Sequence, residues 1–104
     1  MPRESTNIKE RTRSSLREPG KYAVIFHNDD FTPMDFVVML LISIFYKSYE
    51  EADQLMMKVH REGQAMVGVY SYDIAVTKAQ RAVDLARVNG YPLRVSVKSQ
   101  FPNL

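Results

Sequence analysis

Apolar and polar positions vary along the chain with periods that predict six regular elements. Residues 22–27 are nearly all apolar and β-prone, which is typical of a central strand. Residues 33–47 predict a helix that is apolar on almost every side and must therefore be covered on several faces. We expect Thr32 to be the N-cap of this helix, with Pro33 as its first residue.

A polar break at residues 48–51 starts a second predicted helix. Ser48 and Glu51 have the spacing of a capping box, in which each side chain accepts a hydrogen bond from the other residue's backbone. Apolar residues at helical spacing give this helix one buried face, and Gly63 should end it. A short strand is predicted at residues 65–70.

Small residues dominate the buried stripe of a third predicted helix, which Ser71 should cap and Asn89-Gly90 should end. A stripe of alanines favours close packing on a sheet. Residues 93–98 alternate apolar and polar side chains, as expected of a half-exposed strand. The order β-α-α-β-α-β predicts an α+β fold, a two-layer sandwich with three helices on one face of a three-stranded sheet.

The first twenty residues differ in composition from the rest of the chain. They hold few large apolar residues, and Pro19-Gly20 closes the segment. They carry five basic and three acidic side chains, whereas residues 21–104 carry nine of each. We therefore expect a flexible N-terminal arm at residues 1–20 and a core domain at residues 21–104. A neutral core argues against binding to nucleic acid, which favours a basic face on the domain itself.

Composition also narrows the class of function. The 104-residue chain has no cysteine, so it has no disulfide, thiol nucleophile or cysteine metal site. Its four glycines form no phosphate-binding loop, and no nucleophile elbow occurs. No apolar run approaches the ~20 residues of a membrane span, and the N-terminus lacks the apolar core of a secretory signal. We expect a cytoplasmic protein with no metal site and no cofactor.

The most distinctive segment is residues 28–36, where an acceptor-rich loop runs from the first strand into the first helix. Asn28, Asp29 and Asp30 present oxygen acceptors at the strand exit, a place where ligands commonly bind. Acceptors suit a ligand that is cationic or donates hydrogen bonds, and they do not suit a phosphate. His60, on the second helix, can face this cluster if that helix packs near the strand exit.

The residues alone leave two interpretations of the acceptor cluster. In one, the cluster and His60 form a polar ring around an apolar hole, with Met34 at its mouth. In the other, Asp29 or Asp30 only caps a turn and His60 is partly exposed. A metal site is disfavoured, because no two histidines lie four residues apart.

Asp73 and Lys78 are a further pair of candidate residues, near the start of the third predicted helix. They lie close in sequence to Tyr70 and Tyr72. The pair forms either an ordinary solvated helix face or a surface that docks a partner protein.

Residues 28–37 closely resemble the N-D-D-Y/F-T-P-M-x-F-V signature of the ClpS family, adaptor proteins of the bacterial Clp protease that act in the N-end rule. The resemblance extends from about Lys21 to Lys98 and so covers the whole predicted core. Phe31 stands where the family more commonly has tyrosine. Further matches are Met-Met-Lys-Val-His at 56–60 with Gly63, Val-Gly-Val at 67–69, Asp-Ile-Ala-Val-Thr-Lys at 73–78 and Tyr-Pro-Leu at 91–93.

The resemblance implies a non-enzymatic, monomeric adaptor that binds proteins whose first residue is Leu, Phe, Tyr or Trp and delivers them to a Clp AAA+ unfoldase. It implies that Asn28, Asp29 and His60 hold the free α-amine. It also implies that Asp73 and Lys78 dock the N-terminal domain of the unfoldase. The residues that it places around the first side chain of the substrate are Asp30, Thr32, Met34, Val37, Met56, Val59 and Leu93.

Physical chemistry supports this role without the family name. An α-ammonium offers three donors, and an amide oxygen, a carboxylate and a neutral imidazole supply acceptors. The alternative is a small ribosome- or RNA-associated α/β domain, suggested by the high isoelectric point and the basic arm. A steep dependence of RNA affinity on salt would mark that alternative. A small hydrolase, the third class, would need a nucleophile motif that the chain lacks.

Overall fold

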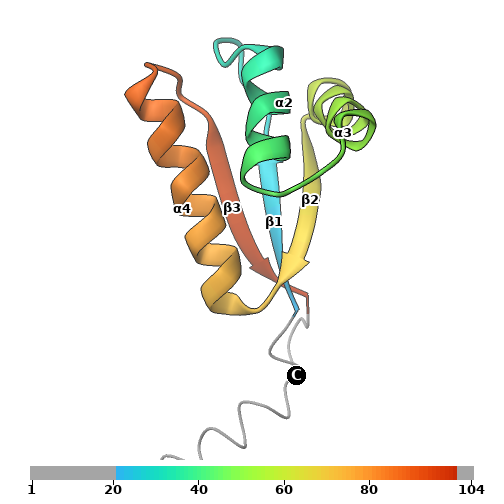
Figure 1. Cartoon of the computed structure of the whole chain (residues 1–104), viewed down its shortest axis with the longest axis vertical. Helices are drawn as coiled ribbons and strands as arrows, with labels where there is room; N and C mark the ends of the chain where they lie inside the picture. Colours follow the sequence, from blue (N-terminus) through green and yellow to red (C-terminus); the bar gives the residue numbers. More distant parts are fainter. Residues whose placement is uncertain (1–20, 101–104) are drawn as a thin grey trace, which may run out of the picture.

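Three helices pack against one face of a three-stranded antiparallel sheet (Figure 1) in the computed structural model, which describes residues 21–100. The predicted α+β two-layer fold is therefore confirmed. The predicted N-terminal arm at residues 1–20 lies outside the described residues, as do residues 101–104. The elements are β1 (Tyr22–His27), α2 (Met34–Ser43), α3 (Tyr49–Glu62), β2 (Gln64–Tyr70), α4 (Tyr72–Val88) and β3 (Arg94–Ser99).

The sheet has the strand order β2-β1-β3, so the strand predicted to be central is central. Both neighbours run antiparallel to β1. At the end of β1, His27 pairs with Gln64 of β2 on one side and with Arg94 of β3 on the other. Because α3 ends directly before β2 begins, this register places the end of α3 beside the exit of β1.

Helix α2 is shorter than predicted, and Thr32 is not its N-cap. Pro33 is the N-cap, with extended backbone angles and no side-chain capping bond, because its carbonyl accepts the first intrahelical hydrogen bond, from the Val37 N–H. The Thr32 hydroxyl donates to Asp29. The helix ends at Ser43, and Tyr46 adopts a left-handed conformation with φ 54°. The backbone N–H of Lys47 then donates to the carbonyl oxygen of Leu41, six positions earlier, at 3.1 Å.

Helix α3 begins and ends where the sequence predicts. The Ser48 side chain accepts a bond from the Glu51 backbone, and the Glu51 side chain accepts one from the Ser48 backbone, so both halves of the capping box form. Gly63 ends the helix at φ 90°, a conformation that favours glycine. Both ends of this helix are therefore set by local chemistry.

Helix α4 uses its alanine stripe to approach the sheet closely. Ala75, Ala79, Ala82 and Ala86 are all buried, as the sequence predicts. Ser71 is the N-cap by position, although its side chain makes no capping hydrogen bond. No helix within residues 21–100 is long and apolar enough to cross a membrane.

Candidate functional site

Asp29 organises the loop that joins β1 to α2. Its Oδ1 accepts hydrogen bonds from the backbone N–H groups of Phe31 and Thr32, both at 2.7 Å. Its Oδ2 accepts one from the Thr32 hydroxyl at 2.8 Å. Asp29 therefore does cap a turn, as one of the two interpretations proposed. A carboxylate has about four acceptor positions, so this bonding leaves capacity for a ligand.

Asp29 also keeps its negative charge. Partial burial acts to raise the pKa of its carboxyl, but the hydrogen bonds from Thr32 and Phe31 and the charge of Arg94 act in the opposite direction and prevail. The pKa of Asp29 consequently lies below its ordinary value. The loop presents a fixed carboxylate at neutral pH, which suits a cationic ligand.

The end of α3 is bonded to this loop through main-chain atoms. The backbone N–H of Asn28 donates to the carbonyl oxygen of Gly63 at 2.9 Å. His60 lies three residues before Gly63, in the last turn of α3, and its side chain is exposed. The condition set by the sequence, that the second helix packs near the strand exit, is therefore met.

The residues predicted to surround the first side chain of a substrate fall into two groups. Val37, Met56, Val59 and Leu93 are buried members of the hydrophobic core. The other group lies at the surface: Asp30 is exposed, Thr32 is half-buried, and 42% of Met34 is exposed. The buried group comes from α2, α3 and the residue directly before β3, whereas the surface group comes from the Asp29 loop and the first residue of α2.

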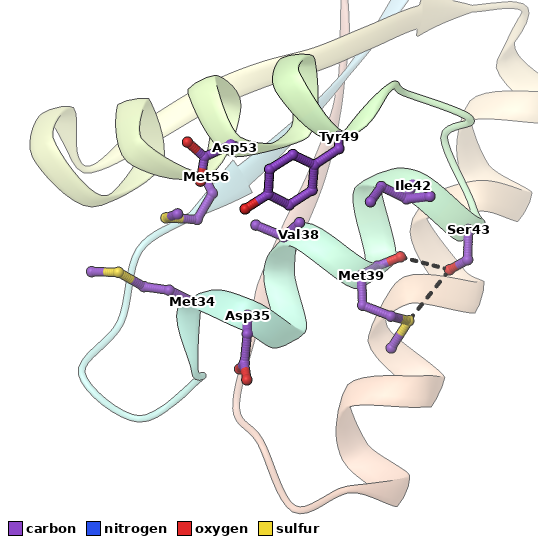
Figure 2. A pocket seen from close by; sticks show the side chains of 9 residues that line it. All are labelled: Met34, Asp35, Val38, Met39, Ile42, Ser43, Tyr49, Asp53 and Met56. Atoms are coloured by element: carbon purple, nitrogen blue, oxygen red, sulfur yellow. Dashed lines mark hydrogen bonds between the residues drawn. The ribbon is translucent and has the colours of Figure 1, made fainter.

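A groove of about 560 Å³ runs between α2 and α3 (Figure 2). Only Met34 and Met56 of the predicted site residues line it. The others were not predicted from the sequence as site residues. A signal was present, because a helix that is apolar on almost every side leaves apolar side chains on its outer face. The remaining lining residues are Asp35, Val38, Met39, Ile42, Ser43, Tyr49 and Asp53.

The two predicted docking residues, Asp73 and Lys78, have different environments. Asp73 is exposed in the first turn of α4. Lys78 is half-buried, and its Nζ donates to the carbonyl oxygen of Ile44 at 2.6 Å, where α2 ends. The same Nζ lies 4.6 Å from the centre of the Tyr46 ring. Burial, followed by the charge of Arg81, lowers the pKa of Lys78. Lys78 therefore links α4 to the C-terminus of α2.

This link predicts a structural effect of replacing Lys78. The variant Lys78→Met keeps the length of the alkyl chain but removes the donor to the Ile44 carbonyl and the cation over the ring. A hydrogen bond from a charged group contributes about 1.5–3 kcal/mol, so we expect the free energy of unfolding to fall by about that amount. Urea denaturation measures the difference, with Lys58→Met on the exposed side of α3 as the control. Equal losses in the two variants would contradict a structural role for Lys78.

The fold and the site define a class of small α+β binding protein that suits a ligand with a positive charge beside an apolar group. The family model of the ATP-dependent Clp protease adaptor protein ClpS matches residues 17–96. The chain therefore belongs to the ClpS family of Clp protease adaptor proteins, as the resemblance of its loop motif implied. Within residues 21–100, no cluster of three His, Cys, Asp or Glu side chains is placed to hold a metal ion.

Individual relatives agree with this assignment. The chain is 59% identical over 81 residues to the ATP-dependent Clp protease adapter protein ClpS of Treponema denticola, covering 78% of this chain and 80% of that protein. It is 47% identical over 92 residues to the ClpS of Burkholderia cenocepacia, covering 88% of each. The solved structure of Agrobacterium tumefaciens ClpS2 bound to L-phenylalaninamide matches with a TM-score of 0.76 and 40% identity, over 79% of this chain and 99% of that one.

Proposed function

We propose that this protein binds the free N-terminal residue of substrate proteins, when that residue is Leu, Phe, Tyr or Trp, and delivers the substrate to a Clp AAA+ unfoldase. The observation that carries the proposal is the Asp29 loop, which is bonded through Asn28 to the end of the helix that bears His60. L-Phenylalaninamide, the ligand of the structurally similar ClpS2, has the matching chemistry of a free α-amine beside an apolar side chain.

The α-amine is assigned to the polar edge of the site. The Asn28 side-chain oxygen, the Asp29 carboxylate and a neutral His60 imidazole are three acceptors for its three donors. Each charge-assisted hydrogen bond contributes about 1.5–3 kcal/mol. An internal Leu or Phe has no ammonium group and would leave these acceptors unpaired, so the site selects chain termini.

The first side chain of the substrate is assigned to the apolar base beside this edge. Burial of a Leu or Phe side chain contributes roughly 1.5–3 kcal/mol. Together with the amine contacts, and after the cost of association, this amount is consistent with micromolar or somewhat tighter binding. The residues assigned to this pocket are Asp30, Thr32, Met34, Val37, Met56, Val59 and Leu93.

The partner surface is assigned to the start of α4. Asp73 is exposed there and is free of the structural contacts that engage Lys78, so we infer that Asp73 contacts the N-terminal domain of the unfoldase directly. Lys78 would contribute mainly by fixing α4 against α2. In this role the protein acts as a monomeric adaptor, without catalytic activity of its own, inside the cytoplasm.

Peptides that differ only in their first residue test the proposed function. Fluorescence anisotropy should show binding of labelled peptides that begin with Leu, Phe, Tyr or Trp. Peptides that begin with Ser or Asp should bind roughly 10- to 100-fold more weakly, because they lack an apolar side chain worth roughly 1.5–3 kcal/mol. Equal affinity for all first residues would refute the proposal. A high affinity for RNA that falls steeply with salt would favour the alternative class.

A further inference from the structure

We propose that the groove between α2 and α3 holds the second to fourth residues of a bound substrate, with an apolar side chain on its floor and a Lys or Arg beside Asp53. This inference rests on the proposed function, because the first residue must already be held at the neighbouring site. It adds a preference for the residues that follow the first one.

The groove is continuous with the site assigned to the first side chain. Met34 of α2 and Met56 of α3 belong to both. Figure 2 shows these two side chains near one another at one end of the groove, whereas Ile42 and Ser43 lie at the other end. A chain whose first side chain is enclosed near Met34 and Met56 therefore meets this groove as it leaves the site.

The length of the groove fits a short extended segment. It follows α2 from Met34 to Ser43, which at ~1.5 Å per helical residue is about 14 Å. An extended chain rises ~3.3 Å per residue, so about four residues match this length, namely the first one at the Met34 end and the three that follow it. The volume of about 560 Å³ is also large enough for several side chains.

The floor of the groove is apolar and open to solvent. Met39 and Ile42, one helical turn apart, are each 39% exposed and both line the hollow. Contiguous exposed apolar side chains of this kind are typical of binding surfaces. The Tyr49 ring from the start of α3 lies beside Val38 across the groove (Figure 2). Methionine side chains adapt to varied partners, so this floor suits apolar residues of differing shape.

The charge of the groove favours a basic substrate residue. Asp35 and Asp53 are among the nine lining residues, and none of the nine is Lys, Arg or His. Asp53 lies next to Met56 in Figure 2, at the end where the substrate would enter. Asp35 points away from α3 in Figure 2, so a cation at the second or third substrate position would lie close to Asp53, whereas an acidic residue there would be repelled.

Three ligands of increasing length test the proposal by calorimetry on the full chain: L-phenylalaninamide, the tetrapeptide amide Phe-Ser-Ser-Ser and the tetrapeptide amide Phe-Leu-Lys-Ser. We expect the Leu-Lys peptide to bind roughly tenfold more tightly than the serine peptide, from partial burial of the leucine and one surface ion pair. The variants Ile42→Ser and Asp53→Asn should each reduce the ratio of the two affinities, Leu-Lys peptide over serine peptide, to roughly threefold or less. Both should leave the affinity for L-phenylalaninamide unchanged.

The control variant is Leu85→Ser, on α4 and outside the groove, where the leucine is 36% exposed and thus similar to Ile42. It should keep the wild-type ratio. A ratio near one in the wild type, or a ratio that Ile42→Ser leaves unchanged, would overturn the groove proposal while L-phenylalaninamide still binds. Failure of L-phenylalaninamide itself to bind would overturn the proposed function and the groove proposal together. A wild-type dimer that Ile42→Ser dissociates in sedimentation would assign the groove to a second copy of the chain.

Discussion

Acetylation of the α-amine should reduce the affinity of a Phe-initiated peptide for this protein at least about 100-fold. It removes the positive charge and two of the three donors that Asn28, Asp29 and His60 are proposed to accept. The loss of two charge-assisted bonds at about 1.5–3 kcal/mol each gives at least about 3 kcal/mol, and 1.4 kcal/mol corresponds to a factor of ten. Competition against a fluorescent Phe-initiated peptide measures the difference.

The matched control for this experiment is the same peptide with a C-terminal amide in place of its carboxylate. That change lies away from the amine and should alter the affinity less than about twofold. Comparable binding of the acetylated and free peptides would show that Asn28, Asp29 and His60 do not form an amine site, even if the apolar pocket is correctly placed.

The variant Asp29→Ala should weaken binding of a Phe-initiated peptide by roughly 30- to 100-fold. Alanine removes the carboxylate that is proposed to contact the ligand's amine. It also removes the acceptor of the hydrogen bonds that the N–H groups of Phe31 and Thr32 donate to Asp29 Oδ1 at 2.7 Å. Because the loop loses its order as well as its charge, the loss should exceed that of one contact. Fluorescence anisotropy measures the affinity, and thermal denaturation measures the accompanying loss of stability.

The variant Asp29→Asn separates these two effects. Its side-chain oxygen can still accept from Phe31 and Thr32, so the loop should stay ordered while the charge is lost. The amide nitrogen cannot accept the bond that the Thr32 hydroxyl donates to Oδ2, so we expect a loss of stability that is smaller than that of Asp29→Ala, together with an intermediate loss of affinity. Asp73→Asn, a remote carboxylate on α4, should leave peptide affinity unchanged. If Asp29→Ala retained wild-type affinity, Asp29 would be a turn cap alone.

The pH dependence of stability gives an independent check on Asp29. Its pKa is depressed in the folded state from the ordinary value of 3.8. A depressed carboxyl pKa stabilises the folded state at pH above that ordinary value, and the contribution is lost as the pH falls through the folded-state pKa. The difference in stability between the wild type and Asp29→Asn should therefore shrink below about pH 4.

The sequence predicted a helix end correctly where that end is set by residues close to one another in the chain. The Ser48–Glu51 capping box and the left-handed Gly63 are examples, because each depends on residues close in the chain. The start of α2 was predicted wrongly for the opposite reason. Thr32 is a good N-cap by type, but its N–H and hydroxyl both belong to the turn that Asp29 organises, and the Pro33 carbonyl accepts the first helical bond.

Long-range features of the site were less accessible from sequence. The proximity of His60 to the acceptor loop depends on pairing between β1 and β2, which brings Asn28 to Gly63 across thirty-five residues of chain. From the sequence, we could predict this proximity only if the second helix packs near the strand exit. The role of Lys78 depends in the same way on a contact with Ile44, the C-cap of a different helix. The sequence did not predict the groove between α2 and α3. The apolar residues of α2 indicate that several of its faces are covered, but they do not indicate which face stays exposed.

The bond between Asn28 and Gly63 has a consequence for how this protein can evolve. Its donor and acceptor are both main-chain atoms, so a side-chain substitution at residue 28, proline excepted, leaves the bond intact, whereas the φ of 90° at residue 63 favours glycine there. The alignment of the loop with α3 therefore does not depend on which side chain residue 28 carries, whereas selectivity in the proposed pocket would depend on side chains such as Met34. Divergent copies of this chain can thus acquire new substrate ranges by surface substitutions while they inherit the same rigid frame.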